Sequence, residues 1–355
     1  MIDWEFPYSE KLLKFYQNSG RHLPWRGDGD PYRIWISEVM LQQTGVAAVK
    51  GYYGRFLSRF PTVAALGAAD LQEVLREWQG MGYYRRAENL HRAARIIRDD
   101  LGGQCPETFA GWLALPGIGR STAGAIMAIG FNRRYAILDG NCKRVLSRVI
   151  ALDEPMDSSQ GIRTLWHWAT QLTPQDRPGD YAQAIMDLGA TVCTPRTPRC
   201  LECPWLAGCR AAVLRRVGDY PNRSKPKERP KYSQVAILVQ DAGRVLLRKR
   251  PAGGLLAGLW EPLSVPRESF RPPPSEADQV VELLWQHWQV LGREMTMLGK
   301  VQHAFTHFHL TVWVYSCRYV SGWPQGEGIG WADHGSDRPV SSLHAKVLAV
   351  SGFSK

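Results

Sequence analysis

The stretch LALPGIGRSTAGAIMAIGF, Leu113 to Phe131, decides the fold of the N-terminal half of the chain. It predicts a helical segment that ends at Leu115, a tight turn over Pro116–Gly119 and a second helix of small residues that starts near Ser121. Glycine lets the turn backbone approach a ligand closely, and the N–H groups at the start of the second helix attract an anion. The stretch is therefore either a phosphate-binding turn or an ordinary helix connection that Ser121 caps.

A proline and two glycines followed directly by a helix have the form of a helix-hairpin-helix element, which grips DNA phosphates without reading the bases. The charge of the chain agrees with a polyanionic partner, because 44 Lys and Arg outnumber 33 Asp and Glu and give a formal net charge of +11. Nucleic acid is the partner that this charge favours. The residues expected at the DNA backbone are Pro116, Gly117, Gly119 and Ser121.

The chain has 355 residues with 44% apolar composition, which is enough for two domains that each have their own hydrophobic core. Apolar residues spaced three and four apart predict helices from Ser9 to about Ala212, with almost no strand. Between Arg210 and Lys231, eight basic residues stand against two acidic ones, and three prolines exclude a continuous helix. We interpret residues 213–232 as a basic linker that contains prolines.

The C-terminal part has a different pattern. QVAILVQ, a DAG turn and RVLLRKR predict a β-hairpin, HLTVWVYSC alternates like a strand, and Ser275 to Val290 is typical of one amphipathic helix. We therefore expect a multi-domain protein, with an all-α region over residues 1–212 and a smaller α/β region over residues 233–355. The N-terminal segment has no secretory or transit character and no apolar run reaches membrane-spanning length, which predicts a soluble cytoplasmic protein without a membrane partner.

Four of the seven cysteines fall within seventeen residues, with the spacing C-x6-C-x2-C-x5-C. Four thiolates so close together in a reducing compartment indicate a metal centre rather than disulfides. Zinc and a four-iron cluster both accept four thiolates, so the spacing leaves the metal open. Arginines inside and beside the loop would also make it a phosphate-binding surface. The four residues are Cys193, Cys200, Cys203 and Cys209.

Two carboxylates stand out in the helical part of the chain. Glu38 lies on the apolar face of a predicted helix, so it is either paired with an arginine, such as Arg26 or Arg33, or a desolvated acid that donates a proton. Asp139 lies where a short apolar run stops and a helical pattern begins, which is typical of an N-cap. The start of a helix also stabilises a negative charge, so a capping Asp139 is expected to be an anion.

Taken in order, these elements resemble the endonuclease III superfamily of DNA glycosylases, and within it the adenine DNA glycosylase family of the MutY type. The matching segments cover nearly the whole chain; they are LPWR, WISEVMLQQT, GMGYYRRAENLH, LPGIGRSTAGAI, ILDGNCKRV, the cysteine spacing and FTHFHL. The resemblance implies an all-α helix-hairpin-helix glycosylase domain with one [4Fe-4S] cluster on the four cysteines, followed by a nudix-like domain. It also implies a base-excision repair reaction, hydrolysis of the N-glycosidic bond of adenine opposite 8-oxoguanine or guanine in duplex DNA.

The resemblance assigns roles to individual residues. Glu38 protonates the adenine and later activates water, Asp139 stabilises or covalently traps the oxocarbenium-like sugar, and Asn141 holds the reacting end of the site. The adenine must leave the base stack first. The residues of the adenine pocket are Trp25, Arg26 and Gln183. The residues that enter the stack or recognise 8-oxoguanine are Gln43, Thr44, Tyr83, Phe305, Thr306 and His307, where threonine replaces the serine of the family.

Two departures from related enzymes limit the expected activity. Ser121 stands where strand-cleaving relatives have a lysine, so no Schiff base with the sugar is expected and the product is an abasic site. The amphipathic C-terminal helix offers only Glu276, Asp278 and Glu282 instead of an R-E-x-x-E-E pattern, so we expect lesion recognition there and no pyrophosphate hydrolysis. The alternatives are a DNA mismatch sensor without turnover and a pyrimidine-lesion glycosylase with lyase activity. A monomer is expected, and whether the linker binds a sliding clamp or another repair protein stays open.

Overall fold

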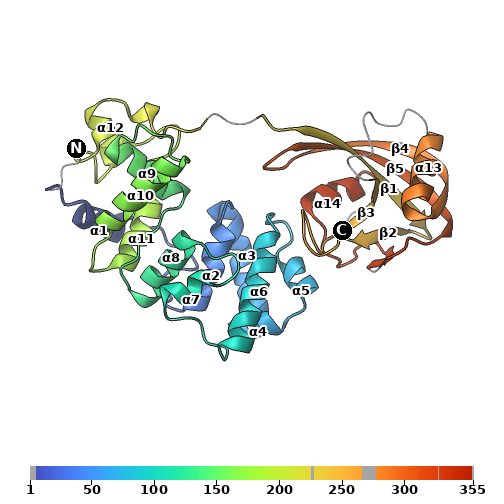
Figure 1. Cartoon of the computed structure of the whole chain (residues 1–355), viewed down its shortest axis with the longest axis horizontal. Helices are drawn as coiled ribbons and strands as arrows, with labels where there is room; N and C mark the ends of the chain where they lie inside the picture. The colour runs from blue at the N-terminus through green and yellow to red at the C-terminus, as the bar shows by residue number, and fades with distance from the viewer. Residues whose placement is uncertain (1–4, 225–227, 266–276, 327, 354–355) are drawn as a thin grey trace. The chain divides into compact units, whose positions relative to one another are not determined.

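The chain forms two compact units in the computed structural model. Unit 1 combines Met1–Ala68 with Asn89–Pro226, and unit 2 combines Ala69–Glu88 with Lys227–Lys355 (Figure 1). The residues that the structure describes are 5–224, 228–265, 277–326 and 328–353. The described part of unit 1 is helical and unit 2 is built on one sheet, which confirms the predicted order of an all-α region followed by an α/β region. Within the described residues, no helix has both the length and the apolar character that a membrane span requires.

The helices of unit 1 are separated by short turns at glycine, proline and polar residues. They are α1 (Tyr8–Ser19), α2 (Pro31–Leu41), α3 (Val46–Arg59), α4 (Val63–Ala68), α7 (Phe109–Leu113), α8 (Arg120–Phe131), α9 (Gly140–Ile150), α10 (Ser159–Leu172), α11 (Pro178–Asp187) and α12 (Arg210–Val213). Shorter helical turns are η1 (Leu188–Val192), η2 (Cys200–Glu202) and η3 (Val217–Asp219). Helix α6 (Arg85–Asp100) begins in the segment Ala69–Glu88 and ends in unit 1.

The core of unit 1 forms where α8, α9 and α11 meet, because these helices bury apolar side chains and approach each other closely. Gly179 of α11 lies against α8, where an added Cβ would come within 2.6 Å of the Ala128 carbonyl oxygen. Side chains such as Leu146 and Ile185 are buried in this core. Each fully buried side chain of this kind stabilises the fold by roughly 1.5–3 kcal/mol. The site described below lies on this rigid framework.

Unit 2 contains a six-stranded mixed sheet with the order β4-β5-β1-β3-β2-β6. Its strands are β1 (Lys231–Asp241), β2 (Arg244–Lys249), β3 (Trp260–Val265), β4 (Val290–Ala304), β5 (His309–Gly322) and β6 (Ile329–Ala332). The predicted hairpin is confirmed, since Asp241 pairs with Arg244 and both turn residues, Ala242 and Gly243, have positive φ. The parallel pairing of β1 with β5 was not predicted. It joins strands far apart in the sequence, and local pattern carries no signal for it.

Two helices cover opposite faces of the sheet. Along β1, Ala236 and Leu238 pack with α14 (Ser342–Ala349), whereas Val235 and Ile237 pack with α13 (Ala277–Trp288). Such alternation places successive strand residues on opposite faces. The predicted amphipathic helix is confirmed over the range of α13, while its first residues, Ser275 and Glu276, lie outside the described residues.

Two packing features extend beyond what the pattern of the chain indicated. The segment Ala69–Glu88, with α5 (Leu71–Glu77), packs in unit 2, although it interrupts unit 1 in the sequence. The chain after α12 stays packed on unit 1, since Tyr220 is buried and its carbonyl accepts a hydrogen bond of 2.9 Å from Arg148 Nε. The predicted boundaries of the linker, 213 and 232, stay a prediction.

Candidate active site and metal centre

A cavity in unit 1 brings together four residues that were assigned to one site from the sequence. Glu38, Trp25, Arg26 and Gln183 line it, together with apolar side chains from α2, α8 and α11. The space between them measures ≈ 390 Å³. Small-molecule sites typically combine apolar walls with a few polar groups. The cavity therefore suits a mostly apolar group with polar edges.

Glu38 is an acid without an ion-pair partner among the described residues. Burial, with a smaller contribution from the negative charge of Asp139, raises the pKa of Glu38 to about 7, and the charge of Arg26 opposes the shift. No ion pair of Glu38 with Arg33 or Arg26 is present among the described residues: Arg33 pairs with Asp28, and Arg26 pairs with Asp187 while its charge still acts on Glu38. Near neutral pH, Glu38 is thus poised to donate a proton.

Arg26 is fixed by Asp187, a fully buried carboxylate at the end of α11. The two terminal nitrogens of Arg26 donate to the two oxygens of Asp187 at 2.6 and 2.7 Å. Arg21 binds the same carboxylate through its side chain and its backbone N–H. Burial alone would raise the pKa of Asp187, but these hydrogen bonds and charges lower it, so the carboxylate stays ionised. A bidentate pair of this kind holds a guanidinium in one orientation. The cavity wall at Arg26 is therefore rigid.

Asp139 is the N-cap of α9, as its sequence context predicts. Its Oδ1 accepts a hydrogen bond of 2.7 Å from the Cys142 N–H, and its Oδ2 accepts one of 3.2 Å from Asn141 Nδ2. The positive end of the helix stabilises a negative charge at this position. The negative charge of Asp139 contributes to the raised pKa of Glu38, although Asp139 does not line the cavity around Glu38.

Asn141 links Asp139 to the cysteine-containing loop through Arg144. The Asn141 Oδ1 accepts a hydrogen bond of 2.8 Å from Arg144 Nη2, and Arg144 also donates to the carbonyls of Gly189 and Cys193. Helix α9 thus carries Asp139 at its start and binds the loop one turn later. Arg144 was not singled out from the sequence, because an arginine in a basic helix gives no signal of its distant partners.

The predicted hairpin is present between α7 and α8, although α7 ends at Leu113, two residues earlier than predicted. Gly117 has a φ of +78°, and an added Cβ would come within 2.7 Å of the Asn89 Cβ. Glycine is needed there for both reasons. Gly119, an exposed residue, is the N-cap of α8, and the first N–H groups of this helix have no acceptor within the helix.

Ser121 does not cap α8, and this alternative is wrong. The helix starts at Arg120, and the hydroxyl of Ser121 accepts a hydrogen bond of 2.9 Å from the Leu138 N–H. Ser121 therefore ties the hairpin to the residue before Asp139. Pro116 lies in the turn and is half-buried.

Three residues expected to enter the DNA stack or to hold the facing lesion lie in loops. Gln43 is exposed with a φ of 59°, and Thr44 follows it, directly after the end of α2. Tyr83 has a φ of 49° and its side chain is 47% exposed. Positive φ is uncommon for residues other than glycine and often marks functional sites. These features favour display to a partner over the ordinary packing of an aromatic residue.

Phe305, Thr306 and His307 form the turn between β4 and β5, which corrects the alternative of a strand edge. Thr306 and His307 are exposed, while Phe305 packs on Phe308 with a centroid distance of 4.7 Å. The Phe305 N–H donates to the Phe308 carbonyl at 2.9 Å, which closes the turn. The turn presents one hydroxyl and one imidazole to its surroundings.

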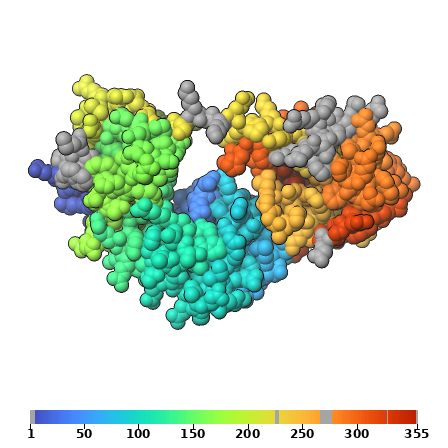
Figure 2. Space-filling model, in the orientation of Figure 1, coloured from blue at the N-terminus to red at the C-terminus, as the bar shows by residue number. Residues whose placement is uncertain are grey.

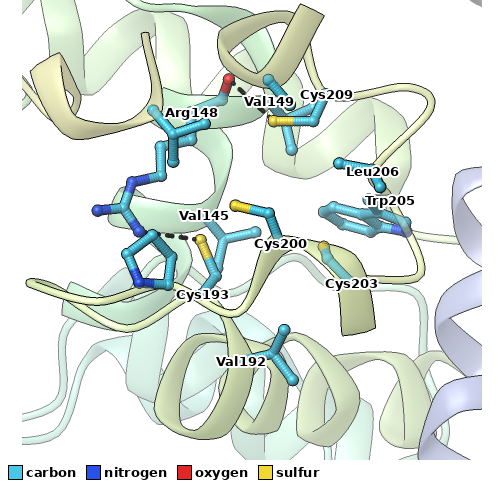
Figure 3. A pocket seen from close by; sticks show the side chains of 13 residues that line it. Val145, Arg148, Val149, Val192, Cys193, Cys200, Cys203, Trp205, Leu206 and Cys209 are labelled. Atoms are coloured by element: carbon cyan, nitrogen blue, oxygen red, sulfur yellow. Dashed lines mark hydrogen bonds between the residues drawn. The ribbon is translucent and has the colours of Figure 1, made fainter. Parts of the chain in front are cut away.

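The cysteine-containing loop surrounds a second cavity of unit 1, of ≈ 390 Å³ (Figure 3). All four cysteines line it, with apolar walls from Val145, Trp205 and Leu206. None of the four is in a disulfide. Arg148, buried in α9, donates to Cys193 Sγ at 3.3 Å and to the Thr194 carbonyl at 2.7 Å. In Figure 2 the yellow surface around α12 adjoins the green surface of the part of unit 1 that contains α9.

The four cysteines supply thiolates, which both zinc and a four-iron cluster accept. Within the described residues, no three His, Cys, Asp or Glu side chains are gathered around a single metal position. A four-iron cluster binds thiolates at separate corners, around a space such as this one. Burial raises the pKa of Cys203 to about 12, so binding must displace a proton there.

Comparisons with known proteins agree with this geometry. Residues 36–171 match the model of the HhH-GPD superfamily of base excision DNA repair proteins, and residues 234–350 match that of the NUDIX domain. Adenine DNA glycosylase of Rattus norvegicus is 38% identical, over 97% of this chain and 77% of that protein. Adenine DNA glycosylase of Mus musculus is 38% identical, over 87% of this chain and 70% of that protein.

A solved structure is similar to the helical part of the chain. A thermostable thymine-DNA glycosylase is 29% identical with a TM-score of 0.54, and the match covers 58% of this chain and 95% of that chain. The helical fold, the hairpin, the two carboxylates and the long similarity to the rat and mouse enzymes lead to one conclusion: the chain belongs to the adenine DNA glycosylase family, within the HhH-GPD superfamily.

Proposed function

We propose that this chain hydrolyses the N-glycosidic bond of adenine opposite 8-oxoguanine or guanine in duplex DNA and stops at an abasic site. The observation that carries the proposal is the cavity with Glu38 in its wall, an acid whose pKa is about 7 beside the negative charge of Asp139. The reaction needs a proton donor and an anion at the same centre. Membership of the adenine DNA glycosylase family identifies adenine as the base that is removed.

The two carboxylates divide the chemistry. Adenine leaves poorly as an anion, so Glu38 protonates the base while the bond to the sugar breaks. Asp139 faces the oxocarbenium-like sugar and stabilises its positive charge or forms a transient bond with it. Glu38, now ionised, accepts a proton from the attacking water. Asn141 donates to Asp139 and keeps its carboxylate oriented.

Trp25, Arg26 and Gln183 form the proposed adenine pocket. The ring of Trp25 is held against Tyr53 with a centroid distance of 5.6 Å, which gives the base an apolar wall. Arg26, fixed by Asp187, and Gln183 supply hydrogen-bonding groups at the same cavity. A rigid pocket of this kind excludes water and orients the base for protonation by Glu38.

In the proposed complex, the backbone of the hairpin and side chains of several loops contact the DNA. Pro116, Gly117, Gly119 and Ser121 belong to the hairpin, whose N–H groups bind a phosphate. Gln43 and Tyr83 enter the stack beside the extruded adenine, and Thr44 holds the facing base. In unit 2, the turn Phe305, Thr306 and His307 recognises 8-oxoguanine, with the threonine hydroxyl in the role of the family's serine. The protein acts as a monomer in the cytoplasm, and a clamp or other repair partner of the linker stays a prediction.

One [4Fe-4S] cluster is the proposed occupant of the cysteine-lined cavity, where it would order the loop. We expect a change of Cys203 to Ser to lower the iron content from roughly four atoms per chain and to remove the visible absorbance of the cluster. Cys105→Ser is the control and should leave both unchanged, since Cys105 does not line the cavity. Metal analysis that finds zinc and no iron in the wild-type protein would exclude the cluster.

The function is tested with an end-labelled duplex that carries one adenine opposite 8-oxoguanine. The wild-type chain is expected to release free adenine, and strand scission should appear only after alkali, because Ser121 offers no amine to the sugar. Binding without release of adenine would replace the proposal with a mismatch sensor. Scission without alkali would instead indicate a lyase.

A further inference from the structure

The segment Ala69–Glu88 is attached to the sheet of unit 2 by three polar anchors. Gln72 Nε2 donates to the Gly258 carbonyl at 2.9 Å, and its Oε1 accepts from Trp260 Nε1 at 3.0 Å. Further along, Arg76 binds Asp337 by an ion pair of 3.1 Å and a hydrogen bond to its carbonyl. The Tyr84 hydroxyl donates to the Val340 carbonyl at 3.2 Å. These bonds hold both ends of the segment to one domain.

Apolar packing at the first anchor is close. Leu75 is fully buried, and an added Cβ on Gly258 would come within 3.3 Å of its Cδ1. Gly258 also has a φ of +68°, which disfavours any other residue. The loop before β3 is therefore shaped to receive α5.

A buried ionic cluster supports this loop from the side of the sheet. Glu261 is fully buried in β3 and binds Arg248, Arg250 and His344 at 2.6 to 3.2 Å. Arg250 in turn holds the loop, since its carbonyl accepts from the Gly258 N–H at 3.2 Å and its Nε donates to the Leu255 carbonyl. The loop that accepts the hydrogen bond from Gln72 is thus already held in shape by these contacts.

The same segment displays Tyr83. The guanidinium of Arg86 lies 5.4 Å from the Tyr83 ring centroid and 5.2 Å from that of Trp78, and its Nη2 donates to the carbonyls of Met81 and Gly82. Trp78 Nε1 also donates to the Gly82 carbonyl, at 3.1 Å. Tyr83 is therefore braced by residues of the segment itself, and the segment is braced by unit 2.

We propose that the C-terminal domain, Lys227–Lys355 of unit 2, positions Tyr83 for insertion into DNA. Gln72, Arg76 and Tyr84 are the positioning residues that anchor the segment carrying Tyr83. The inference rests on the proposed role of Tyr83 in extruding the adenine. Its physical basis is entropic, because an unanchored loop must be ordered each time the ring enters the stack. The C-terminal domain then contributes to base extrusion in addition to reading the facing base.

The experiment uses the full chain with Glu38→Gln, so that extrusion is measured without base release. A duplex carries the fluorescent adenine analogue 2-aminopurine at the target position, and its emission rises when the base leaves the stack. We expect Gln72→Ala to lower the ratio of extruded to stacked base about fivefold. This is the size of effect expected when roughly one buried hydrogen bond is lost. In a chain that already carries Tyr83→Ala, the same change should lower it less than about twofold, because coupled residues are not additive.

Trp260→Phe is the second variant, since it removes the donor to Gln72 from the opposite side and should show the same pattern. Gln286→Ala, a change of an exposed glutamine of α13 that donates to Glu282 of the same helix, is the control and should change neither ratio. Equal effects of Gln72→Ala with and without Tyr83, or an unchanged ratio despite a lower melting temperature, overturn the proposal. Adenine release by the wild type is scored separately, so failure of the proposed function is distinguishable from failure of this coupling.

Discussion

Glu38→Gln is expected to lower the rate of adenine release by about 100- to 10 000-fold, the usual contribution of a general acid. Glutamine keeps the shape of the side chain but has no acidic proton to give to the leaving base. Binding of the mispaired duplex should be retained, because Glu38 faces a cavity of the protein and carries no phosphate contact in the proposed site. Single-turnover kinetics and a binding titration measure the two effects separately.

The pH dependence of the wild type provides a second test of the same residue. Glu38 must be protonated at the start of the reaction, so the single-turnover rate should fall as the pH rises through about 7. Glu10→Gln, a change of an exposed glutamate on α1, is the control and should keep both the rate and this profile. A wild-type rate that stays constant well above pH 7, or a Glu38→Gln variant with the wild-type rate, would falsify the assignment.

The raised pKa of Glu38 also affects stability, and its sign is opposite to that of an ordinary surface glutamate. The folded state favours the protonated form, so this contribution is fully present below about pH 4.5 and is lost as the pH rises through about 7. The change from 4.5 to about 7 corresponds to roughly 3 kcal/mol. Glutamine is neutral at every pH, so Glu38→Gln should unfold at a higher temperature than the wild type above neutral pH.

Local sequence patterns predicted the elements that carry the chemistry. The Pro-Gly-Ile-Gly turn, the cap at Asp139 and the apolar surroundings of Glu38 depend on neighbours within a few residues, and the structure places them as expected. The four cysteines form one cavity for the same reason, since they fall on a single loop. The meeting of Trp25, Arg26 and Gln183 in one cavity was expected from the family resemblance, not from the local pattern.

Partners that are distant in the sequence were not predictable from pattern alone. Asp187 lies 161 residues from Arg26, and the carbonyl that Arg144 binds on Cys193 lies 49 residues away. A charged residue usually indicates a solvated surface, so no pattern separates these buried arginine contacts from ordinary surface charges. The packing of α5 in unit 2 could not be predicted for the same reason, because Gln72 and Gly258 are 186 residues apart. Such contacts need three-dimensional information.

Asp139→Asn should separate the cap of α9 from the catalytic charge. Asparagine caps a helix about as well as aspartate, and its carbonyl can accept the Cys142 N–H as Asp139 Oδ1 does. Its amide group, however, would face Asn141 Nδ2, which is a donor, and Asn141 cannot turn without losing its bond from Arg144 Nη2. We therefore expect a loss of stability of about 1 kcal/mol and a folded protein.

Adenine release by Asp139→Asn should nevertheless fall by about 100- to 1000-fold, because a neutral amide does not stabilise a cationic sugar. The negative charge of Asp139 also raises the pKa of Glu38, so the residual activity should decline at a lower pH than in the wild type. Asp30→Asn is the matched control, since Asp30 caps α2 in the same way and should lose little activity. A variant that unfolds or no longer binds DNA would show that Asp139 is only a cap, whereas a folded, binding and inactive protein with the shifted profile assigns both roles to one carboxylate.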